Sequence, residues 1–171
     1  EDIIGLLERM FSESSLDIKN VDAISAAQGP GSYSGLRGGL AAAKSLAQAL
    51  NIPIAGVSTL EAMAFNLINA EGTIVSILDA VRGELNLALF ASDSKKLTRL
   101  TEDIVIKEER VKELISNIKG EIHIVTNVDS IKNGGHNIKY ADKAHVLALG
   151  INVAMIGLEK ILSGHSDDHL T

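Results

Sequence analysis

The feature that most constrains the fold is a glycine-rich run, Gly29-Pro30-Gly31-Ser32-Tyr33-Ser34-Gly35, between two apolar segments. Residues 21–27 are small and largely apolar, which predicts a buried strand. Residues 35–50 predict an Ala/Leu-rich helix, which Pro53 ends because proline cannot continue a helix. Glycine permits the tight turn that such a junction requires. The run therefore predicts an α/β fold in which the helix begins close to the sheet.

The same run has two chemical interpretations that its details do not favour. A glycine-rich turn before a helix suits an anion, but the run lacks the Gly-Lys-Ser/Thr of a Walker loop. It also misses the third glycine of a dinucleotide fingerprint by one residue. Tight packing is favoured, with nucleotide binding as the alternative. Ser34 does not fit a Gly-x-Ser-x-Gly nucleophile elbow and is expected to cap the helix.

The rest of the chain alternates helices and strands. Apolar spacing predicts a first helix that reaches Phe11, and Ser58-Thr59-Leu60-Glu61 predicts a capping box at the start of another. Residues 73–78 and 85–91 should pair as an antiparallel hairpin. Later segments predict a strand at 104–106, a helix at 108–118, a strand at 122–126, and a long helix from 140 to 162 with Leu149 inward. This order predicts a mixed sheet flanked by helices, in lobes of residues 1–70 and 71–171.

Composition narrows the classes of function. The 171 residues carry a net charge of −6, with 3% aromatic residues, so the chain is unsuited to grip nucleic acid by itself. It has no cysteine, which excludes disulfides and thiolate catalysis. No apolar stretch is expected to be long enough to span a bilayer, so we expect a cytoplasmic protein without a membrane partner.

Two clusters could carry chemistry. His165 and His169 would share a face of a helix and could hold a metal, but a solvated tail is favoured, as is a simple loop role for His136. Asp79-Ala80-Val81-Arg82-Gly83-Glu84 could hold an acid–base pair. The favoured interpretation is that Arg82 neutralises Asp79 or Glu84 while Gly83 supplies the turn. No catalytic residue, metal or cofactor is therefore expected.

Three segments together resemble the bacterial TsaB (YeaZ) family. They are the run Gly29 to Arg37 with Ala43-Lys44-Ser45-Leu46-Ala47, the segment Ile54-Ala55-Gly56-Val57-Ser58-Thr59-Leu60-Glu61-Ala62-Met63-Ala64, and the turn Asp79 to Glu84. The resemblance covers about residues 20–90. It implies an actin-like, RNase H-like ATPase fold that has lost catalytic competence. That family opens with a strand carrying an Asp-Thr-Ser-type signature and a hairpin, which this chain does not show. We therefore expect the first sheet to lack N-terminal strands and nucleotide binding to be absent.

The resemblance also implies a function. Such proteins act with a TsaD-type transferase and a TsaE-type ATPase in forming threonylcarbamoyladenosine in tRNA, so the chain is expected to be a non-catalytic scaffold that meets tRNA only through the complex. A second copy of the chain is an alternative partner. The alternative functions are a metal-dependent peptidase or hydrolase and a free-standing ATPase.

The family's association surface is built from the first helix and the helix after the glycine-rich loop. Small side chains on the latter helix would let a partner helix approach closely; the alternative is that they face the sheet. The motif-loop residues are Gly29, Pro30, Gly31, Ser32 and Gly35. The expected interface residues are Leu36, Arg37, Leu40, Ala43, Lys44, Ala47 and Leu7.

Overall fold

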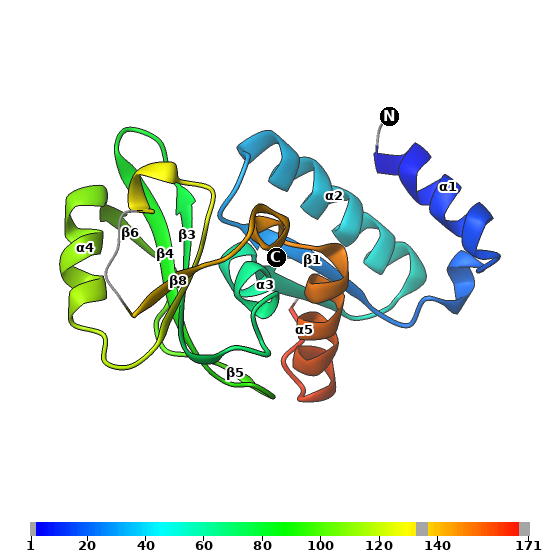
Figure 1. Cartoon of the computed structure of the whole chain (residues 1–171). Helices are drawn as coiled ribbons and strands as arrows, with labels where there is room; N and C mark the ends of the chain where they lie inside the picture. Colours follow the sequence, from blue (N-terminus) through cyan, green and yellow to red (C-terminus); the bar gives the residue numbers. More distant parts are fainter. Residues whose placement is uncertain (1–2, 133–136, 168–171) are drawn as a thin grey trace. The chain divides into compact units, whose positions relative to one another are not determined.

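The computed structural model describes residues 3–132 and 137–167, and the chain divides into two compact units (Figure 1). Residues 1–57 and 153–171 make the first unit, and residues 58–152 make the second. The two units follow contacts within the chain, and the predicted lobes of residues 1–70 and 71–171 stay a prediction. Helix α3 (Thr59–Phe65) packs on strands of the second unit, while most of the last helix, α5 (Gly150–Leu162), belongs to the first.

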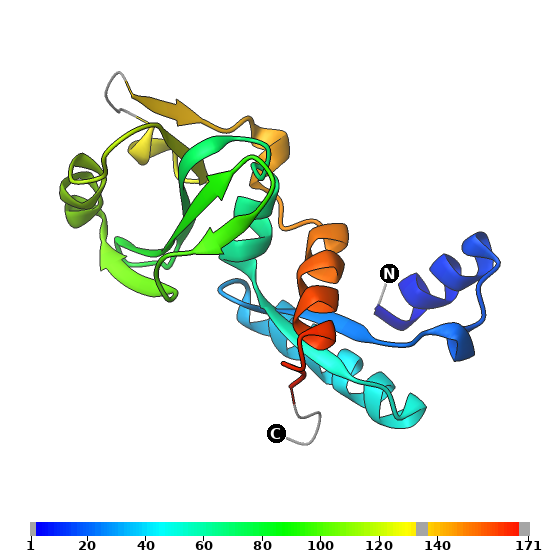
Figure 2. The same ribbon diagram turned by 90° about the horizontal axis from the view of Figure 1, so that it is seen from below.

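The first unit is built around a two-stranded sheet. Helix α2 packs on β1 on the side of Ala26 and Gln28. Ser25 points to the opposite face, as alternation along a strand requires. There α5 crosses the two strands, with Gly157 against Ser25 and Ala55 (Figure 2). The elements are α1 (Ile3–Ser14), a 3-10 turn (Ile18–Asn20), β1 (Ile24–Gly29), α2 (Tyr33–Leu50) and β2 (Ile54–Ser58).

The second unit holds the mixed sheet. Its strand order is β5-β4-β3-β7-β8, with β6 also paired to β4. The predicted hairpin is confirmed, because β3 and β4 pair antiparallel from Glu71 opposite Asp93 to Asp79 opposite Leu85. Strand β7 runs parallel to β3. The elements are β3 (Glu71–Asp79), β4 (Glu84–Asp93), β5 (Leu97–Arg99), β6 (Ile104–Lys107), α4 (Glu108–Ser116), β7 (Ile122–Thr126), 3-10 turns at Asp129–Ile131 and Lys143–Val146, and β8 (Ile138–Tyr140).

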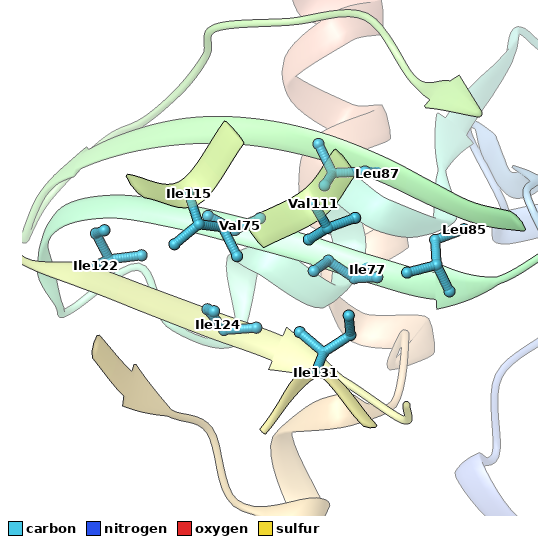
Figure 3. Close-up of a cluster of buried hydrophobic side chains, with 9 residues drawn as sticks. All are labelled: Val75, Ile77, Leu85, Leu87, Val111, Ile115, Ile122, Ile124 and Ile131. Atoms are coloured by element: carbon cyan, nitrogen blue, oxygen red, sulfur yellow. The ribbon is translucent and has the colours of Figure 1, made fainter. Parts of the chain in front are cut away.

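Both faces of this sheet are covered by apolar side chains. On one face, Val111 and Ile115 of α4 pack against alternate residues of β3, β4 and β7 (Figure 3). On the other face, α3 contributes Leu60, Met63 and Ala64 to a second core. The Ser58 half of the predicted capping box is confirmed, because Ser58 Oγ accepts a hydrogen bond from the Glu61 N–H at 3.3 Å. The Glu61 carboxylate, expected to reach back to Ser58, accepts a hydrogen bond from Arg99 Nη2 at 3.0 Å.

The predicted helix from 140 to 162 is wrong over its first half. The carbonyls of His145 and Leu147 each accept a hydrogen bond from Asn66 Nδ2 at 2.7 Å, so they are not used in a helical ladder. Asn152 donates in turn to Asn66 Oδ1. Leu149, expected to point inward, is 41% exposed.

The expectation about membrane-spanning length is also corrected. Residues 144–162 are long and apolar enough to cross a membrane by length and composition. The structure divides that segment into a 3-10 turn and α5. Since α5 has 13 residues, it is about 20 Å long, which is less than the roughly 30 Å of a bilayer's hydrocarbon core.

Candidate partner-binding surface

The glycine-rich loop is a packed junction between β1 and α2. Gly29 has a φ of +112°, where a side chain is strained, and a Cβ there would lie 3.2 Å from Leu36 Cδ1. A Cβ on Gly31 would contact the same leucine. The loop glycines therefore let Leu36 pack over the turn, which supports the packing interpretation over a phosphate cradle.

Helix α2 begins earlier than predicted. Its N-cap residue is Ser32, whose side chain makes no capping hydrogen bond. The Ser32 carbonyl already accepts from the Leu36 N–H at 2.9 Å. Ser34 consequently lies within the first turn, and the expectation that it caps the helix is wrong.

The expected interface residues on α2 do not share one face. Ala47 is fully buried, so it packs within the unit and is inaccessible to a partner. Ala43 and Leu36 line an apolar cavity of about 360 Å³ between α1, β1 and α2. Leu40 and Lys44 line another cavity, of about 230 Å³, beside β2. Many of the small residues thus face the sheet, as the alternative interpretation allowed.

The outer face of α2 is nevertheless small and open. Ser34, Gly38, Ala41 and Ser45 are all exposed and follow one another along the helix. A Cβ on Gly38 would meet no atom within 4 Å. A glycine within a helix lowers the stability of the fold by roughly 0.5–1 kcal/mol relative to alanine. No close packing inside the unit requires a glycine at position 38. The separation of packed helices depends on the side chains at their contact, so this face lets a partner helix approach closely.

Helix α1 presents an apolar ridge to solvent. None of its residues is buried, and Leu6 and Met10 are 43% and 50% exposed. Ile3, at the edge of this ridge, is 40% exposed and also lines the cavity beside β1 and α2. Residues three and four apart lie on one face of a helix. Leu7, an expected interface residue, lies with Phe11 on the side toward α2, where both line an open cavity of about 690 Å³. Exposed apolar patches of this kind mark interaction sites.

A stacked tyrosine–arginine pair stands at the beginning of α2. The Arg37 guanidinium carbon lies 5.3 Å from the centroid of the Tyr33 ring. Arg37 Nη1 also donates a hydrogen bond to Tyr33 Oη at 3.2 Å. Tyr33 is 72% exposed. The expected interface residue Arg37 is therefore exposed and held in place by its neighbour one turn away.

The turn at residues 79–84 does not have the ion pair that we expected. Asp79 Oδ1 accepts a hydrogen bond from the Val81 N–H at 3.0 Å. Among the described residues, Arg82 pairs with neither Asp79 nor Glu84. Gly83 supplies a positive φ as expected, and Val81 and Arg82 adopt one as well, so three consecutive residues of the turn are left-handed.

The predicted metal-binding pair of His165 and His169 falls only partly within the described residues. His169 and His136 lie outside the described residues. His165 Nδ1 lies 3.1 Å from Ser163 Oγ. Within residues 3–132 and 137–167, no group of three or more potential metal ligands gathers.

Comparison with known proteins decides the family. A family model described as TsaD, tRNA N6-adenosine threonylcarbamoyltransferase, matches residues 1–163. Two curated relatives are named tRNA threonylcarbamoyladenosine biosynthesis protein TsaB. The Bacillus subtilis (strain 168) protein is 36% identical over 94 residues, and the Escherichia coli (strain K12) protein is 30% identical over 122 residues. The chain belongs to the TsaB (YeaZ) family.

The matches to these TsaB proteins are partial. They cover 55% of this chain and 41% of the B. subtilis protein, and 70% of this chain and 53% of the E. coli protein. The chain therefore spans about half the length of the TsaB relatives it matches.

A solved structure of low sequence identity has the same fold as this chain. YeaZ from Pseudomonas aeruginosa superposes with a TM-score of 0.84 at 17% identity, over 99% of this chain and 79% of that one. This likeness confirms the predicted actin-like, RNase H-like α/β fold.

Sequence reasoning missed the outward ridge of α1 and the partner of Arg37. The sequence did contain a signal for the ridge. Apolar residues at positions 3, 6 and 10 make the apolar face of this helix wider than packing against α2 alone requires. Tyr33 carried no comparable signal, since its exposure depends on where α2 begins.

Proposed function

We propose that this chain takes part in forming threonylcarbamoyladenosine in tRNA as a non-catalytic subunit that binds a TsaD-type transferase. The names of its TsaB relatives assign those proteins to this biosynthesis. The observation that carries the proposal is the exposed apolar ridge of α1 (Leu6 and Met10, with half-exposed Ile3 at its edge), on a helix that buries none of its residues.

The energetics of α1 favour a role in association. An isolated helix of 12 residues is marginally stable in water. Leu7 and Phe11 of α1 line an open cavity instead of a closed core, and no residue of the helix is buried. Fully burying an aliphatic side chain contributes about 1.5–3 kcal/mol, so covering three half-exposed ones is a substantial driving force. The exposed small residues of α2 complete this surface.

Charge and composition support a division of roles within the proposal. A chain with a net charge of −6 and 3% aromatic residues is unsuited to hold tRNA alone, so tRNA is held by other members of the complex. A TsaE-type ATPase joins the same cytoplasmic assembly. A second copy of this chain would cover the same ridge and compete with the transferase.

The proposal is tested by Leu6→Glu, with binding to the TsaD-type transferase of the same genome measured by calorimetry. Because burying an unpaired carboxylate is costly, we expect affinity to fall at least tenfold, that is by about 1.4 kcal/mol or more. Val105→Glu is the matched control, since Val105 is an apolar residue of the second unit that is 61% exposed. Circular dichroism checks that both variants fold. Unchanged binding of folded Leu6→Glu would contradict the proposed surface.

A further inference from the structure

We infer that Arg37 is the charged anchor of this surface and that the partner presents a carboxylate to it, on a helix docked along the outer face of α2. The inference rests on the proposed function and adds to it the chemistry of the partner.

Arg37 stands in a part of the chain that has no counter-charge. Residues 23–60 contain Arg37 and Lys44 but no aspartate or glutamate, although the whole chain is acidic. In the described part of the structure, the hydrogen bond of the Arg37 guanidinium goes to the Tyr33 hydroxyl, and no carboxylate pairs with it. A guanidinium carries five N–H donors, so most of its hydrogen-bonding capacity is directed to solvent.

Other arginines of the chain are satisfied internally. Arg99 binds two carboxylates, Glu61 at 3.0 Å and Asp103 at 2.6 Å. Arg110 binds Glu113 at 3.0 Å. Arg82 also has no ion pair among the described residues. What distinguishes Arg37 is that its unpaired guanidinium is also stacked on an exposed aromatic ring.

Tyr33 organises Arg37 for such a contact. The stack and the hydrogen bond between them restrict the guanidinium before any partner arrives. A side chain ordered in advance loses less conformational freedom on binding. Tyrosine and arginine are also the residue types enriched at the energetic centres of interfaces. The pair therefore has the features of a binding anchor rather than of a solvated surface charge.

The surroundings favour a protein carboxylate over a nucleic-acid phosphate. Nucleic acid is held by several cations together, and the nearest basic residue along the sequence, Lys44, lines a cavity beside β2 rather than the outer face of α2. Next to Arg37, Gly38 leaves the helix surface open. An approaching helix can therefore bring an aspartate or glutamate within bidentate distance of the guanidinium, a strong, charge-assisted geometry.

The test measures binding of the full chain to the TsaD-type transferase of the same genome, by calorimetry. We expect Arg37→Gln to weaken binding about tenfold and Arg37→Glu about a hundredfold. Arg110→Gln, which removes a paired arginine from the second unit, is the control and should bind as the unsubstituted chain does. Raising the salt concentration should weaken the unsubstituted chain more than Arg37→Gln, because salt screens the pairing.

Tyr33→Ala supplies a second measurement. It should weaken binding and reduce the further loss caused by Arg37→Gln, since the two residues act together. If Arg37→Glu binds normally while Leu6→Glu does not, the anchor is refuted and the surface stands. If both variants bind normally, the proposed surface itself fails.

Discussion

Replacing Gly38 is expected to move stability and partner binding in opposite directions. Gly38 lies within the 18-residue helix α2, is exposed, and would place a Cβ with no atom within 4 Å. The substitution therefore has no steric cost, and the change reduces to helix propensity. Alanine is favoured over glycine by about 0.8–1.0 kcal/mol, so Gly38→Ala should raise the melting temperature by roughly 2–4 °C.

Gly38→Leu separates the two effects more clearly. Leucine is almost as good a helix former as alanine, so most of the stability gain should remain. Its side chain would stand where we propose that a partner helix approaches, and affinity for the TsaD-type transferase should fall at least tenfold. Urea denaturation followed by circular dichroism gives the stability change, and calorimetry gives the affinity.

Two results would refute this reasoning. A loss of stability in Gly38→Ala would mean that the outer face of α2 is already covered within the chain. A stabilised Gly38→Leu variant that binds normally would mean that no partner approaches α2 closely at this position.

Three further predictions concern stability. Gly157→Ala places a Cβ against the Ser25 side chain, closer than van der Waals contact allows, and should lower the free energy of unfolding in urea by about 1–3 kcal/mol. Adding Ser25→Gly should restore most of that stability, and no loss at all would mean that α5 does not pack there. Arg99→Gln leaves two partly buried carboxylates without their cation and should cost about 2 kcal/mol; a loss near zero would show that the network is dispensable. The hydrogen bond from Lys139 holds the pKa of Glu121 below its usual value, so its stabilising contribution is present above the ordinary carboxyl pKa and is lost as pH falls through the lowered one. Between about pH 6 and pH 3, Glu121→Gln should therefore lose less melting temperature than the unsubstituted chain, and an equal loss would refute the pairing.

Local signals predicted the elements that depend on local chemistry. Ser58 caps α3 because its hydroxyl lies three residues before the Glu61 N–H, from which it accepts a hydrogen bond. The hairpin of β3 and β4 follows from a β-branched segment at 73–78 and an apolar segment at 85–91, joined by a short turn with Gly83. In these cases the residues that determine the structure lie close together in the sequence.

Predictions failed where distant residues intervened. Apolar spacing before α5 indicates a helix, but Asn66 takes the carbonyls of His145 and Leu147 from 79 and 81 positions away. Likewise, the alanines of α2 look alike in sequence, and only the packed unit distinguishes buried Ala47 from exposed Ala41. The interface on α2 therefore stays a prediction, and the structure adds which of its residues are exposed and which are buried.

The central claim, that α1 and α2 form a partner-binding surface, is tested most directly by hydrogen–deuterium exchange. The chain would be compared alone and with the TsaD-type transferase of the same genome. The account predicts a stable complex in which amides of residues 3–14 and 33–50 gain protection while those of the second unit's sheet do not change. Absence of a complex, or protection confined to residues 58–152, would contradict it.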